Sequence, residues 1–555
     1  MCVKSMSTKL RTNKPIIDKT SWSYNKLSTL IQKTLFALLS GGLLSLSFLD
    51  AAYYFVVWVA FIPFLIAING ASLRRSYCLG LISGLAFCIS AGYWVIDFIM
   101  LSKGYDFSLS FFWSLIFWFY CAQLSALIAL SFNWMKQRSQ VHEFILFPLV
   151  IVTLYSAFPM LFTVRLGESQ SQFLSAIQAT EFTGVHGLDA IIALSNIMLF
   201  KVINLLSTNQ KKQTNWPWLL ATIIIIAWLT YGLFAMQIWD IKIEDSDTIR
   251  IGIVQPNEAP SLEKSKSYPG YSRAYPPEMA MTERLSKDGA EIVIWPEAKY
   301  KAYLDQPRVS KAFQNQINLL NTSLVFQDIE HKKSPQKVNN LQYNSAVMLD
   351  QNGEELGQYQ KMKRIAFGEY VPLVSDVPVL RTWIEDFFGR FLNEMAQGTS
   401  HQVFEHQKLN IIPLICYEVM FPEFVAEAVA LTQAENKSGN LLVGLSSNGW
   451  FGTTRQPYQH VNASILRAVE NRTPLVHAVN NGPSIVAIPN GRVIFISDYH
   501  QAGGYVVDIP YSNSFKRSFY SQYPKLFTYS VYGILILVIV LSSKTVKRSS
   551  KDVVF

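Results

Sequence analysis

Charged residues are scarce in this sequence. Of its 555 residues only 16 % are Asp, Glu, Lys or Arg, whereas 50 % are hydrophobic. A soluble globular chain carries about 25 % charged residues. The deficit therefore argues against a soluble protein and favours one embedded in a membrane.

Cysteine is also rare, and the five cysteines form no zinc-binding or disulfide spacing. Cys2 is terminal, and three others lie in apolar runs, at Cys78, Cys88 and Cys121. Cys416 is the one cysteine in the polar half of the chain. No internal repeat or low-complexity tract appears in the sequence.

The net charge of +9 does not indicate nucleic-acid binding, because of where the basic residues lie. Seven of them precede residue 34, with Asp18 as the only acid in that stretch, and others sit in short loops between apolar runs. This placement fits the positive-inside rule and an anionic inner leaflet better than a basic groove.

Spanning the hydrocarbon core takes about 20 apolar residues. Eight candidate spans are found near 34–50, 52–70, 78–100, 108–134, 143–163, 185–206, 216–236 and 526–543. The first could instead be a signal peptide, although the apolar runs after it and the lack of a clear cleavage site weaken that alternative.

Loop charges predict the orientation. With a cytoplasmic N-terminus, the inside loops carry the basic pairs Arg74–Arg75, Lys136–Arg138 and Lys211–Lys212. We therefore expect a basic cytoplasmic segment (1–33), a transmembrane domain of about seven helices (34–239), an extracytoplasmic domain (240–525), a last transmembrane helix (526–543) and a basic cytoplasmic tail (544–555).

The segment 240–525 reads as an α/β domain with one or two sheets. Runs such as "TIRIGIVQPN", "TSLVFQDIE", "NLLVGLSSN" and "SIVAIPNGRV" are typical of strands. Helical patterns such as "PPEMAMTERLSKDG" and "HVNASILRAVENRT" lie between them.

Three reactive side chains follow apolar runs in this domain. "IVIWPE" ends at Glu297, "YQK" at Lys361, and "IIPLIC" at Cys416. Sheets of this class place reactive groups at strand ends. Each residue alone gives only weak support for a catalytic site. A lone cysteine, for example, is usually a small buried apolar residue.

Together the three resemble the Glu-Lys-Cys set of the nitrilase superfamily, and the surrounding motifs narrow the resemblance. "WPE", "YQK…FGEYVP", "ICYE", "SSNGWFG", "QHVNASILRAVE" and "NNG" follow in the order typical of the apolipoprotein N-acyltransferases, and "TEFTGVHGLDAIIALSN" at 180–196 resembles their membrane half. The resemblance implies a multi-pass α-helical membrane domain joined to a nitrilase-like αββα sandwich.

The resemblance also implies roles. Cys416 would be the nucleophile, Glu297 the general base and acid, and Lys361 the oxyanion stabiliser. Glu369, Tyr417 and Glu418 match further positions of the family's site. No metal or organic cofactor is expected, because a base beside the thiol suffices to generate the thiolate.

Two features keep alternatives open. Glu418 could be a first-turn acid of the following helix, favoured by the helix dipole, as well as a site residue. The stretch 379–395 could be an ordinary amphipathic helix or an arm that admits acyl chains from the membrane; its large side chains are Trp383, Phe387, Phe388, Phe391 and Leu392. His460 and His477 are expected to be structural.

The sequence departs from the family pattern at three places. No tryptophan follows "VQPN", where Tyr268, Tyr271 and Tyr275 could substitute in packing. Asn448 stands in "SSNGWFG" where an acid is usual, and "IAFGE" replaces "VPFGE".

The resemblance thus implies an acyltransferase of a bacterial inner membrane with a periplasmic catalytic domain. It would move an acyl chain from a phospholipid, through a thioester, to the α-amino group of a diacylglyceryl apolipoprotein. The alternatives are a membrane-anchored amidase or hydrolase of the nitrilase type and a diverged paralogue that only binds lipoproteins.

Overall fold

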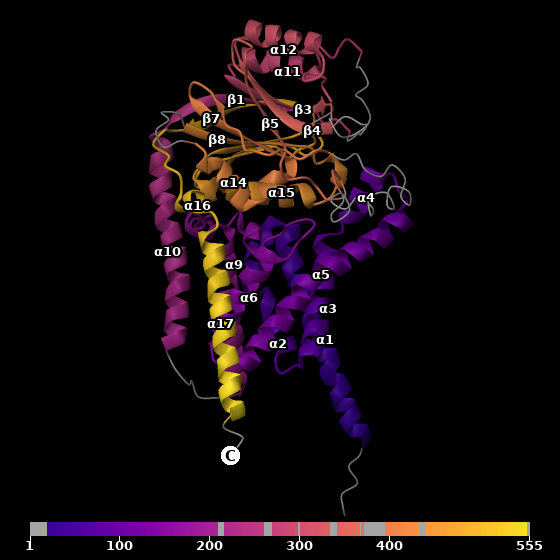
Figure 1. The fold of residues 1–555 in the computed structure, drawn as a ribbon, viewed down its shortest axis with the longest axis vertical. Coiled ribbons are helices and arrows are strands. Elements are labelled where there is room, and N and C mark those ends of the chain that lie inside the picture. The colour runs from indigo at the N-terminus through magenta and orange to yellow at the C-terminus, as the bar shows by residue number, and fades with distance from the viewer. Residues whose placement is uncertain are drawn as a thin grey trace, which may run out of the picture.

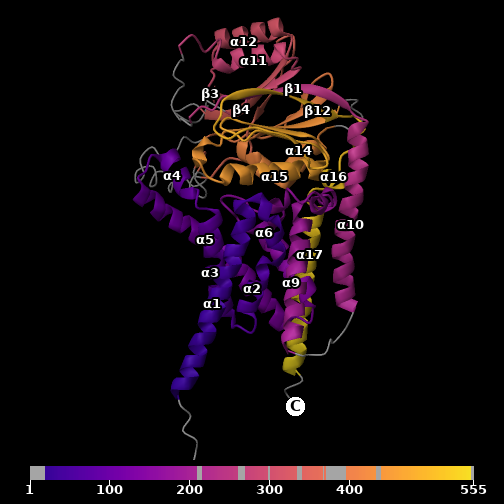
Figure 2. The same ribbon diagram turned by 180° about the vertical axis from the view of Figure 1, so that it is seen from behind.

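A computed structural model describes residues 19–208, 216–259, 269–297, 300–333, 341–366, 368–370, 395–432 and 439–551. Figure 1 shows two stacked parts, a bundle of long helices below and a layered α/β domain above it. Helices α10 (Trp216–Glu244), in magenta, and α17 (Leu526–Lys551), in yellow, run along the same side of the bundle toward the α/β domain (Figure 2).

A helix lies at each of the eight predicted spans. They are α1 (Lys19–Leu49), α2 (Val57–Ile68, preceded by the 3-10 helix η1, Ala51–Val56), α3 (Leu73–Ala91), α5 (Phe107–Arg138), α6 (Glu143–Ala157), α9 (Val185–Thr208), α10 (Trp216–Glu244) and α17 (Leu526–Lys551).

Length and apolarity allow five helices of the described part to cross a membrane, or six if the bent pair α3 and α4 (Val95–Lys103) forms one span. The angle between α3 and α4 is 58°. Helix α6 and the apolar part of α17 are shorter than 18 residues. The eight-span topology and the domain boundaries stay predictions.

The α/β part is a sandwich of two six-stranded sheets, which confirms the predicted fold class. The first sheet has the order β12-β1-β2-β3-β4-β5 and the second the order β11-β10-β9-β8-β7-β6. The strands are β1 (Asp247–Gln255), β2 (Ile292–Ile294), β3 (Ser323–Lys332), β4 (Leu341–Leu349), β5 (Glu355–Gln360), β6 (Phe404–Glu405), β7 (Leu409–Ile415), β8 (Gly439–Ser446), β9 (Leu475–Val479), β10 (Ile485–Ala487), β11 (Val493–Ile496) and β12 (Gly503–Tyr511).

Helices cover both outer faces of the sandwich (Figure 1). The first sheet is covered by α11 (Pro277–Lys287) and α12 (Pro307–Leu320). The second is covered by α14 (Pro422–Ala430) and α15 (Gln456–Asn471), which lie between it and the helical bundle. The α/β domain therefore rests on the membrane half through α14 and α15.

Successive side chains of a strand point to opposite faces of its sheet, so each of the two sheets packs on both faces and three apolar cores form. Ile251, Ile294 and Ile411 belong to a core between the two sheets. Val293 and Phe313 belong to the core under α11 and α12. A third core joins Leu442 of the second sheet and Val425 of α14 to the membrane helices, so the two halves share one apolar interior.

Two sequence predictions about elements need correction. The run "SIVAIPNGRV" is a hairpin of β10 and β11 rather than one strand, because Gly491 turns the chain at a φ of +87°. Strand β2 ends at Ile294, so Glu297 lies three residues beyond the strand rather than at its last position.

Candidate active site

Cys416 directly follows strand β7 and begins a short 3-10 helix, η3 (Cys416–Met420). Its φ of +53° is left-handed, a conformation that residues other than glycine rarely adopt. Such backbone strain is maintained only where the surroundings fix it, and it is concentrated at functional sites. The turn at Cys416 therefore places the thiol at the end of strand β7, where the apolar run of the sequence predicts it.

A side chain of strand β4 holds the Glu297 carboxylate in place. Asn344 Nδ2 donates to Glu297 Oε1 at 2.7 Å, and Gln327 Nε2 in turn donates to Asn344 Oδ1 at 2.9 Å. Glu297 also lies close enough to Cys416 for the two groups to shift each other's pKa. Burial raises the pKa of Glu297 and Glu369 raises it further, while Lys361 lowers it. A carboxylate with a raised pKa is suited to take up and return a proton near neutral pH.

Lys361 follows strand β5 directly and is buried. Its Nζ donates to Glu369 Oε1 at 2.8 Å. Burial alone would lower the pKa of Lys361, but the charges of Glu369, Cys416 and Glu297 raise it well above its usual range. The ammonium is therefore a fixed positive charge beside the thiol.

The Cys416 thiol is protonated at rest. Burial raises its pKa well above the usual range, Glu297 raises it further, and Lys361 lowers it. A protonated thiol next to a carboxylate needs the proton removed as it attacks. The geometry thus brings Glu297, Lys361, Cys416 and Glu369 together in one site.

Glu418 does not face this group, and it is not a first-turn acid of α14 either. It is fully buried, and its Oε1 accepts from Tyr359 Oη at 2.7 Å and from the N–H groups of Met362 and Lys363 at 2.7 and 3.0 Å. Its Oε2 accepts from Ile415 N at 2.8 Å. Glu418 therefore ties the nucleophile turn to the segment that carries Lys361.

Tyr417 points to the membrane half. Its hydroxyl accepts from Thr163 N at 2.7 Å, and its ring lies edge-on to Phe162 at a centroid distance of 5.8 Å. Burial raises the pKa of Tyr417 to about 12. Tyr417 is therefore a neutral link between the nucleophile turn and the loop before η2 (Leu166–Gln170).

His460 reaches the backbone of the nucleophile rather than its thiol. Its Nε2 lies 3.2 Å from the Cys416 carbonyl oxygen, and its Nδ1 lies 3.2 Å from Asn448 Oδ1. Burial lowers the pKa of His460 to about 4. An acid in place of Asn448 would favour a charged imidazole, whereas the amide leaves His460 neutral. His477 bonds Ser446 and Ser464.

Some predicted residues lie outside the part described. Residues 371–394 are among them, and so the arm residues Trp383, Phe387, Phe388 and Phe391 keep both sequence interpretations. Tyr268 lies outside as well, while Tyr275 donates to Glu283 of α11 at 2.8 Å. In the ranges described, no group of three His, Cys, Asp or Glu residues is placed to hold a metal ion.

The sequence interpretation missed Asn344. Its signal is a single amide inside the otherwise strand-like run "LQYNSAVMLD", where a buried polar side chain requires a partner. The partner, Glu297, lies 47 residues away in the sequence, so only the fold identifies it.

Comparison with known proteins covers both halves. Residues 40–198 match the family described as "Apolipoprotein N-acyltransferase N-terminal domain", and residues 271–513 match "Carbon-nitrogen hydrolase". A protein named apolipoprotein N-acyltransferase from Geobacter metallireducens is 27 % identical over 89 % of this chain and 92 % of its own length. Another of that name from Chlorobaculum tepidum is 24 % identical over 92 % and 96 %.

Among solved structures, an amidase of the nitrilase superfamily from Nesterenkonia is 19 % identical and covers 48 % of this chain and 92 % of its own, with a TM-score of 0.34. The membrane-half match, the hydrolase-domain match and the relatives that align along most of both chains together confirm the resemblance of this chain to the apolipoprotein N-acyltransferases.

Proposed function

We propose that the chain transfers an acyl chain from a phospholipid to the α-amino group of a diacylglyceryl apolipoprotein, through a thioester on Cys416. The hydrolase domain and the names of the relatives support its assignment as an acyltransferase. The observation that carries the proposal is that Glu297 and Lys361, which follow strands of the first sheet, meet Cys416, which follows a strand of the second. The domain that holds them rests on apolar helices (Figure 1).

In the first half-reaction Glu297 takes the thiol proton while sulfur attacks the ester carbonyl carbon. The negative charge that develops on the carbonyl oxygen is stabilised by Lys361 and by a backbone N–H near Tyr417, and each such donor is worth about 3 kcal/mol. The C–O bond then breaks, Glu297 returns the proton to the leaving oxygen, and a lysophospholipid departs.

In the second half-reaction the apolipoprotein amine attacks the thioester carbon and gives up a proton to Glu297. The C–S bond breaks, and the thiolate recovers a proton, so that an amide forms and the enzyme returns to its starting state. Splitting the transfer removes the need to align two lipids at once, and it predicts ping-pong kinetics.

The membrane half supports a lipid substrate, since both donor and acceptor would be held in the leaflet beside the site. We further propose that the α/β domain lies on the periplasmic side of a bacterial inner membrane, with both chain termini in the cytoplasm. The loop charges of the sequence support this orientation.

The function is tested with purified protein, acyl-labelled phospholipid and a diacylglyceryl peptide. Label on the peptide amine supports the proposal. Free labelled fatty acid in place of acylated peptide would instead indicate a hydrolase, and peptide binding without turnover would indicate a binding paralogue.

A further inference from the structure

The loop between α6 and η2 belongs to the membrane half but contacts the nucleophile turn at both ends. At the start of the turn, Thr163 N donates to the Tyr417 hydroxyl at 2.7 Å. At its end, Arg165 Nη1 donates to the Met420 carbonyl oxygen at 2.8 Å. The turn therefore depends on this loop on one side and on Glu418 on the other.

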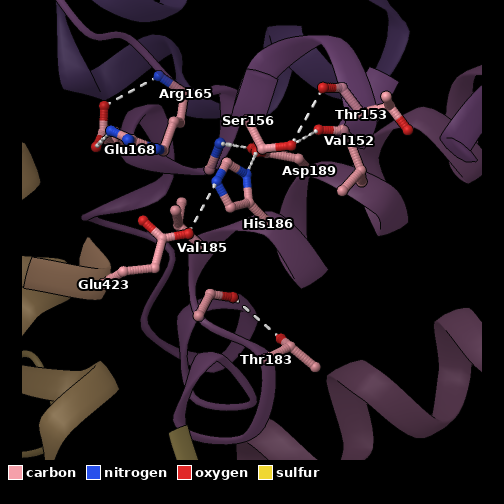
Figure 3. A network of polar contacts seen from close by, with 12 residues as sticks. Val152, Thr153, Ser156, Arg165, Glu168, Thr183, Val185, His186, Asp189 and Glu423 are labelled. Carbon is pink, nitrogen blue, oxygen red and sulfur yellow. Dashed lines mark hydrogen bonds and ion pairs between the residues drawn. The ribbon is translucent and has the colours of Figure 1, made fainter. Parts of the chain in front are cut away.

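Arg165 is buried and held in place by Glu168 (Figure 3). Glu168 Oε2 accepts from the backbone N–H of Arg165 at 3.0 Å, and its Oε1 lies 3.4 Å from Arg165 Nη1. Glu168 Oε1 also lies 3.8 Å from Arg467 Nη2 on α15. A guanidinium fixed in this way presents its N–H groups in one geometry.

Helix α9 anchors the same loop. Asp189 Oδ1 accepts from Gly167 N at 2.8 Å, and Asp189 Oδ2 lies 3.0 Å from His186 Nδ1. His186 Nε2 in turn lies 3.9 Å from Glu423 Oε1, in the first turn of α14 (Figure 3). Contacts from one membrane helix thus reach both the loop that holds the turn and the helix that follows it.

We propose that Arg165 is a positioning residue of the membrane half, which fixes the left-handed turn of Cys416 in its reactive orientation. Arg165 bonds a carbonyl four residues after the nucleophile and does not contact the thiol. A misplacement of about 1 Å in a reacting group can cost about a hundredfold in rate. This role rests on the proposed acyl transfer as the reaction of Cys416. The rate at which the Cys416 thiol is alkylated can nevertheless be measured without any acyl transfer.

The test compares Arg165→Gln with Arg472→Gln as a matched control. Arg472 is also buried and also joins the halves, since its Nη1 donates to Gln178 Oε1 at 2.7 Å, but it lies at the far end of α15 from the turn. Iodoacetamide alkylation of Cys416 is followed by mass spectrometry as the alkylated fraction of the peptide that contains it.

For Arg165→Gln we expect Cys416 alkylation and kcat of acyl transfer to fall about tenfold, with KM within about twofold, since the turn is displaced but the lipid sites are not. Arg472→Gln should leave both rates per folded protein at the wild-type level. Arg165→Lys keeps the positive charge but loses the planar guanidinium, so its alkylation rate and kcat should lie between those of the wild type and Arg165→Gln. If Arg165→Gln does not accumulate, the comparison is made with Arg165→Lys.

Equal alkylation and equal kcat for the Arg165 and Arg472 variants would overturn the positioning role. If the wild-type protein transfers no acyl chain and Arg165→Gln still slows alkylation, the proposed function fails while the positioning role stands.

Discussion

At the residue scale, the reactive thiol is surrounded by one cation and two carboxylates. Lys361 and Glu369 form an ion pair at 2.8 Å, and Glu297 is the carboxylate that most raises the pKa of Cys416. Burial raises the pKa of both Cys416 and Glu297, so the proposed mechanism starts with the proton on sulfur and beside a carboxylate disposed to accept it.

Asn344→Leu tests how this proton acceptor is tuned. The hydrogen bond from Asn344 lowers the pKa of Glu297, so its removal raises that pKa further. Glu297 must be ionised to accept the thiol proton, and activity is lost as the pH falls through its pKa. We therefore expect the acid limb of the kcat/KM profile to move to higher pH, with the smallest loss of rate at the alkaline end.

Asn410→Leu is the matched control. Asn410 is another buried asparagine in a strand, but it lies at the end of β7 away from Cys416 and hydrogen-bonds Asn440. Its acid limb should coincide with that of the wild type. An unchanged limb in Asn344→Leu, or a shift to lower pH, would contradict the assignment of Glu297 as the base.

At the element scale, close helix packing builds the membrane half. Gly80 and Gly84 lie one turn apart on α3, and a Cβ at Gly84 would meet the Ala122 carbonyl oxygen of α5 at 2.7 Å. Small residues at this spacing let two helix backbones approach each other in a membrane. The α3–α5 pair thereby forms the support beneath α4.

Gly84→Leu should separate α3 from α5 and destabilise the protein by about 1–3 kcal/mol, the usual cost of overpacking. Thermal unfolding of the detergent-solubilised protein measures this as a lower Tm. Gly42→Leu on α1 is the control, since a Cβ there has no atom within 4 Å. Equal Tm values for the two variants would show that α3 and α5 do not require this contact.

The elements could be predicted from the sequence where one local pattern decides them. The run before Cys416 is apolar and β-branched, so both strand β7 and its end were predictable. The hairpin of β10 and β11 also has a local signal, Asn490–Gly491 between two apolar runs, which the interpretation of "SIVAIPNGRV" as one strand passed over.

The site residues divide in the same way. Glu297, Lys361 and Cys416 follow apolar runs and carry family motifs, so sequence alone nominates them. Arg165 and Asn344 owe their importance to contacts with Met420 and Glu297, which are 255 and 47 residues away in sequence. No local pattern encodes such pairings.

At the scale of the whole molecule, the catalytic sandwich is continuous with its membrane support. One apolar core includes side chains of α2, α9, α14 and β8, so the two halves pack as one body rather than as a domain on a linker. This arrangement fixes the height of the active site above the helices and supports a substrate drawn from the leaflet.

The proposed orientation predicts opposite signals from reporter fusions after residues 212 and 300. A phosphatase that is active only outside the cytoplasm should be inactive at the first position and active at the second, because helix α10 separates them. The same activity at both positions would contradict the topology.

The central claim is that Cys416 carries the acyl chain, and an acyl-enzyme trapped without acceptor tests it most directly. The purified protein is incubated with acyl-labelled phospholipid alone and then treated with neutral hydroxylamine, which cleaves thioesters. The account predicts that the wild-type protein retains label that hydroxylamine removes and that Cys416→Ala retains none. Label that survives the Cys416→Ala substitution, or an active wild-type protein that retains no label, would contradict it.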